Sequence, residues 1–204
     1  MTNAPSQPEG DAGASVAGGV GASAALARVL VAMDIQRLLS STEDLRQVDG
    51  PAAAASAHLR RVLGGTRTDR FLRGSWLGHP VHPLLVTVPI GAWTGAAVLD
   101  GVPGQQEAAR RLVGLGVAFT APAVIAGLAD WSALDTRQRR VGVVHAATNA
   151  VAAACFAVSY RRRGQGKHAA GAAWGLAGLT WVGIGGALGG HLSYALGAGV
   201  GRWQ

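Results

Sequence analysis

The sequence has a single cysteine, few aromatic residues and little charge. Charged residues make up 14% of its 204 residues and aromatic residues 5%, whereas hydrophobic residues make up 49%. Soluble domains usually carry about 25% charged residues. The lone Cys155 excludes an intrachain disulfide and any cluster that needs several thiolate ligands, so we expect no intrinsic iron–sulfur cluster. This composition indicates a membrane protein.

Catalytic motifs are also missing. The sequence contains no nucleophile–base set, phosphate-binding loop or hydrolase motif, which disfavours an ordinary soluble enzyme. The net charge of +7 comes from arginine clusters between apolar stretches. Basic loops that border anionic headgroups explain this distribution, so the expected partner is a lipid bilayer and not a nucleic acid.

Three regions follow from the distribution of residue types. Residues 1–24 are rich in Ala, Gly, Ser and Pro and contain no Lys or Arg, which predicts a disordered tail without a secretory signal. Residues 25–75 combine apolar stripes with five arginines between Arg60 and Arg73, and Trp76 follows. This pattern predicts an amphipathic helical segment at the membrane interface. Residues 76–204 form the expected membrane domain.

Four uncharged stretches predict membrane-spanning helices over about residues 83–100, 110–130, 141–161 and 170–196. Each approaches the ~20 residues that cross ~30 Å of hydrocarbon. Backbone groups in lipid must be hydrogen-bonded within the segment, so these stretches are helices. Short connections predict an all-α, up-down-up-down four-helix bundle. The side that holds the amino terminus collects more arginines, so we expect both termini in the cytoplasm and the protein in the inner (plasma) membrane.

Histidines mark one end of this predicted bundle. His79 and His82 open the first stretch, His145 lies early in the third, and His191 lies late in the fourth. With four crossings these positions share one side of the membrane, whichever way the chain is oriented. An ionisable ring at membrane depth costs about 2 kcal/mol or more unless it is paired or binds a ligand. The four histidines therefore form a candidate site.

Two further polar residues lie close to these positions. Asn149 shares a helical face with His145, and Asp130 ends the second stretch on the same side. We expect both to orient histidine rings through hydrogen bonds, as partners of metal-binding histidines usually do.

Several chemistries fit these residues. Two facing imidazoles hold the iron of a b-type haem, and three or four hold a zinc, copper or iron ion. Histidines also pass protons near neutral pH. Alternatively, the rings are structural and tie helix ends together through backbone carbonyls. For a haem we expect His82 and His145 to be the ligand pair, with His191 next.

The string GSWLGHPVHPLL at residues 74–85, followed by VPIG at 88–91, resembles a bacterial membrane protein family called domain of unknown function 2231. GLADW at 127–131, RVGVVH at 140–145 and GGHLSY at 189–194 match its later segments. The resemblance covers about residues 70–200 and implies four membrane helices. Some members are linked to Rieske-type iron–sulfur or c-type cytochrome domains, which implies electron transfer. This chain has neither a Rieske motif nor a CxxCH string, so such a partner has to be a separate protein.

The leading functional hypothesis is a membrane-embedded redox subunit. In it, His79, His82, His145 and His191 supply ligands for a b-type haem or a metal ion near one surface. The alternative is a non-enzymatic membrane scaffold or assembly protein with structural histidines. A small transporter or proton channel has less support, because only Pro89 and Pro122 interrupt the helices and no acidic residue lies at mid-depth.

Overall fold

The computed structural model describes residues 34–200, of which residues 34–41 are helical. The predicted tail (1–24), the start of the predicted interfacial segment (25–33) and residues 201–204 lie outside the described residues. From Ser41 onward the described chain forms one compact unit.

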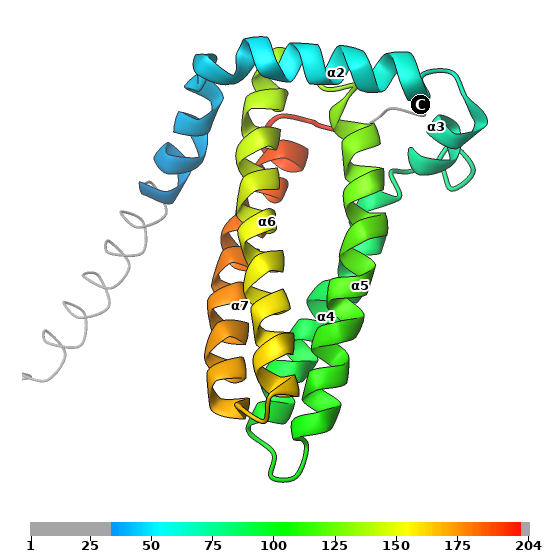
Figure 1. Cartoon of the computed structure of the whole chain (residues 1–204). Helices are drawn as coiled ribbons and strands as arrows, with labels where there is room; N and C mark the ends of the chain where they lie inside the picture. Colours follow the sequence, from blue (N-terminus) through cyan, green and yellow to red (C-terminus); the bar gives the residue numbers. More distant parts are fainter. Residues whose placement is uncertain (1–33, 201–204) are drawn as a thin grey trace, which may run out of the picture. The chain divides into compact units, whose positions relative to one another are not determined.

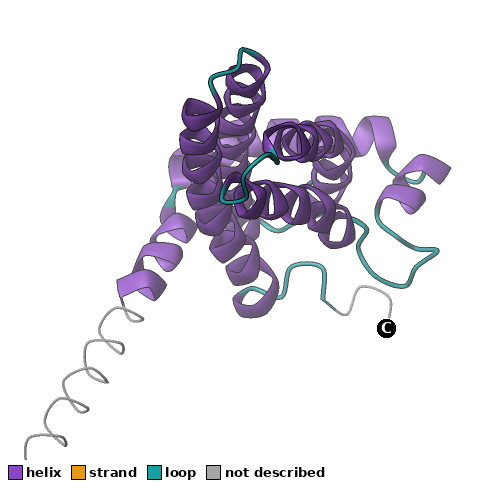
Figure 2. Cartoon of the chain, turned by 90° about the horizontal axis from the view of Figure 1, so that it is seen from below, coloured by secondary structure: helices purple, strands orange, loops and turns teal. Residues whose placement is uncertain are grey.

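The described residues fold into helices and loops, without a strand (Figure 2). Two short 3₁₀ turns, η1 (Thr42–Asp44) and η2 (Arg46–Val48), precede the helices α2 (Asp49–Leu63), α3 (Arg67–Leu72), α4 (His82–Asp100), α5 (Gln106–Trp131), α6 (Thr136–Gly164) and α7 (His168–Gly190), and a π-helical turn, η3 (His191–Ala195), follows α7. The all-α prediction is confirmed.

Among the described residues, four helices are long and apolar enough to cross a membrane, and these are α4, α5, α6 and α7 with its η3 extension. This confirms the four predicted spans. The helix α6 has 29 residues and is therefore longer than the ~20 residues needed to cross the hydrocarbon layer. A capping box starts it, because the Gln138 N–H donates to the Asp135 carboxylate and the Asp135 N–H donates back to the Gln138 side chain. Because hydropathy identifies only the apolar part of a helix, the predicted span of 141–161 is shorter than α6 at both ends.

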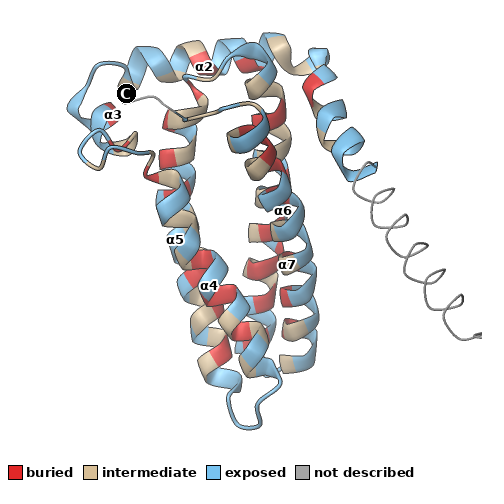
Figure 3. Cartoon of the chain, turned by 180° about the vertical axis from the view of Figure 1, so that it is seen from behind, coloured by how far each residue is buried: buried red, intermediate tan, exposed pale blue. Residues whose placement is uncertain are grey.

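The four long helices form two antiparallel hairpins, α4–α5 and α6–α7, which pack side by side (Figure 1). The start of α4, the end of α5, the start of α6 and the end of α7 share one end of the bundle, which we call the α2 end because α2 lies across it. The opposite end, with the α4–α5 and α6–α7 loops, is called the far end. Buried residues gather on the faces that meet other helices, and the outward faces are exposed (Figure 3).

The core of the bundle is centred on a stacked pair of rings. The ring centroids of Trp93 in α4 and Phe156 in α6 are 3.9 Å apart, with 6° between the ring planes. Each ring lies over a glycine of its own hairpin partner: Trp93 over Gly116, and Phe156 over Gly178. A Cβ atom on Gly178 would come within 2.6 Å of the Phe156 ring. Glycine at these two positions is therefore required for the close packing of rings against helices.

Three pairs of matched residues join α4 to α6. His82 contacts His145, and Trp93 stacks on Phe156. Asp100 forms a salt bridge with Arg163, in which the Asp100 Oδ2 lies 2.6 Å from the Arg163 Nη2. The two members of each pair are 63 residues apart. Gly116 on α5 and Gly178 on α7 also correspond to each other, and they are 62 residues apart in the sequence.

The α4–α5 and α6–α7 hairpins are therefore structural repeats. Because equivalent residues contact each other, an approximate two-fold axis runs between α4 and α6, parallel to the helices. Parallel repeats of this kind recur in membrane proteins.

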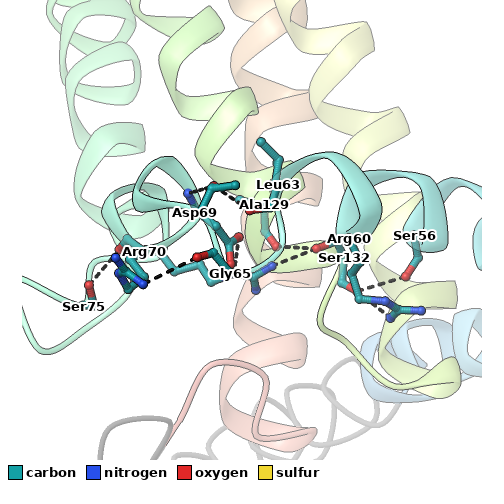
Figure 4. Close-up of polar contacts among 11 residues, drawn as sticks. Ser56, Arg60, Leu63, Gly65, Asp69, Arg70, Ser75, Ala129 and Ser132 are labelled. Carbon is teal, nitrogen blue, oxygen red and sulfur yellow. Dashed lines mark hydrogen bonds and ion pairs between the residues drawn. The ribbon is translucent and has the colours of Figure 1, made fainter.

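Polar contacts fasten α2 and α3 to the end of α5 (Figure 4). The Ser56 hydroxyl and the Arg60 guanidinium both donate to the Ser132 carbonyl, each at 2.9 Å. The Arg73 guanidinium donates to the Ser132 hydroxyl at 2.9 Å and to the Asp69 carboxylate at 2.7 Å. The bonds from Ser56 and Arg60 satisfy the Ser132 carbonyl, which the end of α5 leaves without a helical partner.

Replacing Asp100 with Asn should lower the free energy of unfolding by about 3 kcal/mol, because the Arg163 guanidinium would be left buried without its counter-charge. Only 1% of the Arg163 side chain is exposed. Thermal or denaturant unfolding of the detergent-solubilised protein measures the change. Glu107→Gln is the matched control, because it removes a carboxylate that is 55% exposed, and it should cost less than about 1 kcal/mol. Equal effects of the two substitutions would show that the buried pair does not hold the hairpins together.

Candidate functional site

The structure places the predicted site residues at the α2 end of the bundle. His82 is the first residue of α4, His145 lies in the third turn of α6, and His191 begins η3 directly after α7. Asp130 is the second-last residue of α5 and is half-buried. The common end follows from the alternating directions of the four helices. Within it, the individual residues have different partners.

His82 and His145 face each other between the two hairpins. Their ring centroids are 6.3 Å apart, and the ring planes are nearly perpendicular, at 82°. Both rings are half-buried. These are the two residues that the sequence favours as a ligand pair, and the structure brings them together.

Each of the two rings is anchored through the same nitrogen atom. The His82 Nδ1 lies 2.8 Å from the Ala123 carbonyl on α5, and the His145 Nδ1 lies 2.8 Å from the Gly185 carbonyl on α7. A carbonyl oxygen only accepts, so each Nδ1 carries the proton and donates. In a neutral ring, Nε2 then keeps its lone pair and is able to bind a proton or a metal ion. The carbonyls of Ala123 and Gly185 thus place the proton of each neutral ring on Nδ1.

Glycines make room for both rings. Gly127 lies one turn after Ala123, and a Cβ atom there would be 2.9 Å from the His82 Nδ1. Gly189 lies one turn after the other acceptor, Gly185, and a Cβ atom there would be 3.1 Å from the His145 Cε1. Both imidazoles therefore occupy equivalent cradles on the two hairpins, with a carbonyl to accept and a glycine beside it.

Asn149 lies next to His145, as predicted. Its Nδ2 donates to the His145 carbonyl at 2.8 Å and lies 3.4 Å from both ring nitrogens. A Cβ atom on Gly185 would come within 2.7 Å of the same amide. Asn149 thus packs between the ring and α7. Whether Asn149 and Asp130 orient a ligand-binding ring stays a prediction.

His191 contacts a carboxylate and not the His82–His145 pair. Its Nε2 lies 2.7 Å from the Glu43 carboxylate, and both side chains are buried. Arg137 donates to the other oxygen of the same carboxylate, and Arg140 donates to the Glu43 carbonyl at 2.8 Å. Glu43 belongs to η1, 148 residues away along the chain. No local pattern in the sequence distinguishes it from the other acidic residues of the amino-terminal segment.

Charged contacts lower the pKa of two carboxylates in this segment. Burial alone would raise the pKa of Glu43, but the hydrogen bonds from His191 and Arg137 outweigh it and hold the pKa below its ordinary value. The bidentate contact with Arg140, at 2.6 and 2.7 Å, lowers the pKa of Asp49 despite some desolvation. Both carboxylates are therefore ionised at neutral pH and fasten η1 and α2 to α6.

His79 lies apart from the helical histidines. It precedes the first residue of α4, its side chain is exposed, and its Nδ1 lies 3.2 Å from the carbonyl of Pro80. His79 and His82 do not share a helical turn, because Pro80 and Val81 between them are not helical. Residue preferences at a helix start do not decide whether the helix begins at the first or the second proline.

No group of three or more His, Cys, Asp or Glu side chains that would hold a metal ion is present within residues 34–200. The histidines that the structure brings into ring contact are two, His82 and His145. The arrangement is therefore that of a paired-imidazole site between two helices.

Four apolar helices with a polar site at one end define a multi-pass helical membrane protein. A family model described as predicted membrane protein (DUF2231) matches residues 78–202. The chain belongs to this family, as the resemblance of the HPVHP segment implies. No curated protein and no solved structure matches the chain.

The stability of the protein should depend on pH through Glu43. A carboxylate whose pKa is lowered on folding stabilises the protein above its unfolded pKa, and this contribution is lost as the pH falls through the folded pKa. The Tm difference between the wild type and Glu43→Gln should therefore be constant above about pH 6 and should shrink below the ordinary pKa of 4.5. Thermal unfolding in detergent across this range measures it, with Asp44→Asn as the exposed neighbour control. A difference that does not change down to pH 3 would contradict the role given to the Glu43 carboxylate.

Proposed function

We propose that this protein is a membrane-embedded electron-transfer subunit in which His82 and His145 hold a b-type haem between the two hairpins. The observation that carries the proposal is the pair of equivalent imidazoles, each anchored through Nδ1, so that each neutral ring has an unprotonated Nε2. A haem bound in this way supplies one-electron chemistry.

The separation of the rings supports a shared ligand. The ring centroids of His82 and His145 are 6.3 Å apart, so one small group between the hairpins could contact both rings. The buried core cluster around Trp93 and Phe156 lies farther along α4 and α6, so the histidine pair is separate from it. The donor set therefore fits a haem, and a metal ion held by the same residues is the alternative occupant.

The remaining residues at this end have supporting roles in the proposal. His145 is oriented by Gly185 and Asn149, and Asp130 lies at the same end. His191 is the next candidate ligand after the His82–His145 pair, followed by the exposed His79. In the described structure His191 instead binds Glu43, which fastens η1 to the α2 end of the bundle.

A haem near one membrane face needs a separate donor or acceptor. We expect a Rieske-type or cytochrome protein in this role, following the family resemblance. We further propose that the protein resides in the inner membrane with its termini in the cytoplasm, which the arginine distribution supports.

The second candidate function is a membrane scaffold or assembly protein. A specific observation favours it: the bonds from His82 to α5 and from His145 to α7 join the two helices of each hairpin. Rings used only for this purpose need no ligand.

The visible spectrum of the purified, detergent-solubilised protein separates the two functions. We expect a reduced-minus-oxidised haem band with about one haem per chain, lost in His82→Ala and in His145→Ala because each removes one of the two residues that would hold the haem iron. His145→Gln keeps a side-chain amide beside Gly185 but should also lose the band. His58→Ala, on the exposed face of α2, should keep it. A protein that folds normally yet stays colourless after incubation with hemin, and that contains no bound metal, would favour the scaffold.

A further inference from the structure

A surface cavity at the far end of the bundle lies between α5 and α6, away from the histidines. Its volume is about 390 Å³, and its lining residues are Arg110, Arg111, Gly114, Val117, Ala118 and Tyr160. The two arginines belong to the second turn of α5, and Tyr160 belongs to the last turns of α6. The cavity therefore begins where the charged ends of the helices meet the membrane interface.

The polar part of the cavity has one hydrogen-bond donor without a partner. The Arg110 Nε is buried and makes no hydrogen bond within the described chain. The hydrogen bonds of this guanidinium are long, at 3.4 Å to Glu107 and 3.3 Å to the Tyr160 hydroxyl, and its central carbon lies 4.8 Å from the centroid of the Tyr160 ring. Arg111 also binds Glu107, at 3.0 Å. One carboxylate thus serves two guanidinium groups, and the site keeps a net positive charge with donors suited to a phosphate group.

The rest of the cavity is apolar and extends along α5 toward the membrane interior. Positions 110, 114, 117 and 118 lie on one helical face, so the lining covers about 12 Å of depth at 1.5 Å per residue. Gly114 lets the Tyr160 ring lie close against α5 at the wall of the cavity, because a Cβ atom there would come within 2.8 Å of that ring. A cavity that is cationic at the interface and apolar below it matches the two parts of a phospholipid.

Comparison of the two repeats shows that the fold itself does not require this cavity. On α7, Ala172 and Ala173 stand at the positions that correspond to Arg110 and Arg111 on α5. On α4, Ala97 stands at the position that corresponds to Tyr160 on α6. Leu176 stands at the position that corresponds to Gly114. The equivalent groove between α7 and α4 therefore lacks the cations, the hydroxyl and the glycine. Only one of two structurally equivalent grooves has the residues of an anion site.

We propose that the cavity between α5 and α6 binds one anionic phospholipid, with its phosphate on Arg110 and Arg111 and an acyl chain along Val117 and Ala118. The net positive charge selects an anionic headgroup over a zwitterionic one. The site is independent of the histidine pair, and it gives the protein a lipid bound at a fixed position on the face opposite the proposed haem.

Native mass spectrometry of the full chain in detergent tests the proposal, with phosphatidylglycerol and phosphatidylcholine as the two probes. We expect one tightly bound phosphatidylglycerol, with phosphatidylcholine about tenfold weaker. Arg110→Gln should weaken phosphatidylglycerol binding about tenfold, because it removes charge-assisted hydrogen bonds. Arg162→Gln is the matched control, because it removes the same charge from an exposed position at the same end of the bundle. The affinity of this variant for phosphatidylglycerol should stay within about twofold of that of the wild type.

A second variant tests the apolar part of the cavity without changing charge. Ala118→Leu places a larger side chain where the acyl chain is proposed to lie, and it should weaken phosphatidylglycerol binding while the Tm of the protein is kept. Equal affinity for the two lipids, or equal binding by Arg110→Gln and Arg162→Gln, would overturn the proposal. Displacement of the lipid by millimolar inorganic phosphate would overturn it as well, because the site would then bind a free anion.

Discussion

The structure depends on contacts between equivalent residues of two repeated hairpins. Along α4 and α6 these contacts form three layers: an imidazole pair at the α2 end, a stacked Trp–Phe pair in the middle, and a buried salt bridge at the far end. Polar groups inside a membrane protein are costly unless they are paired. Asp100 and Arg163 are paired in this way across the approximate two-fold axis, whereas His82 and His145 each bond to a carbonyl within their own hairpin. The same axis fixes the relative position of His82 and His145.

The two ends of the bundle have different physical characters. The buried core cluster lies toward the far half, where aromatic rings pack onto glycines and Arg163 is neutralised by Asp100. At the α2 end hydrogen bonds add to the packing of buried residues such as Val141 and Ala129, from histidine rings to carbonyls within each hairpin and from η1, α2 and α3 to the ends of the long helices. The chemistry proposed for the protein is therefore located where polar contacts are concentrated.

Much of the fold follows from hydropathy, because a chain in lipid must form helices and must cross the membrane in about 20 residues. The common end of the four histidines follows from connectivity alone, and the pairing of His82 with His145 agrees with the order of preference that the sequence gives. The contact between His191 and Glu43 had no local signal, since it joins residues at opposite ends of the chain. The repeat did have a signal that hydropathy does not use. His82, Trp93 and Asp100 have the same spacing as His145, Phe156 and Arg163, and a comparison of the two halves would have aligned the two histidines and the two aromatic residues.

The central claim is that His82 and His145 face each other across the two repeats at one depth of the membrane. Solid-state NMR of the protein in lipid bilayers, with nitrogen-15 in its 6 histidines, measures this directly through the distance between ring nitrogens. The account predicts a through-space correlation between two imidazoles that disappears in both His82→Gln and His145→Gln, and that survives in His58→Gln. Spectra in which neither substitution removes a ring–ring correlation, while the protein remains folded, would contradict it.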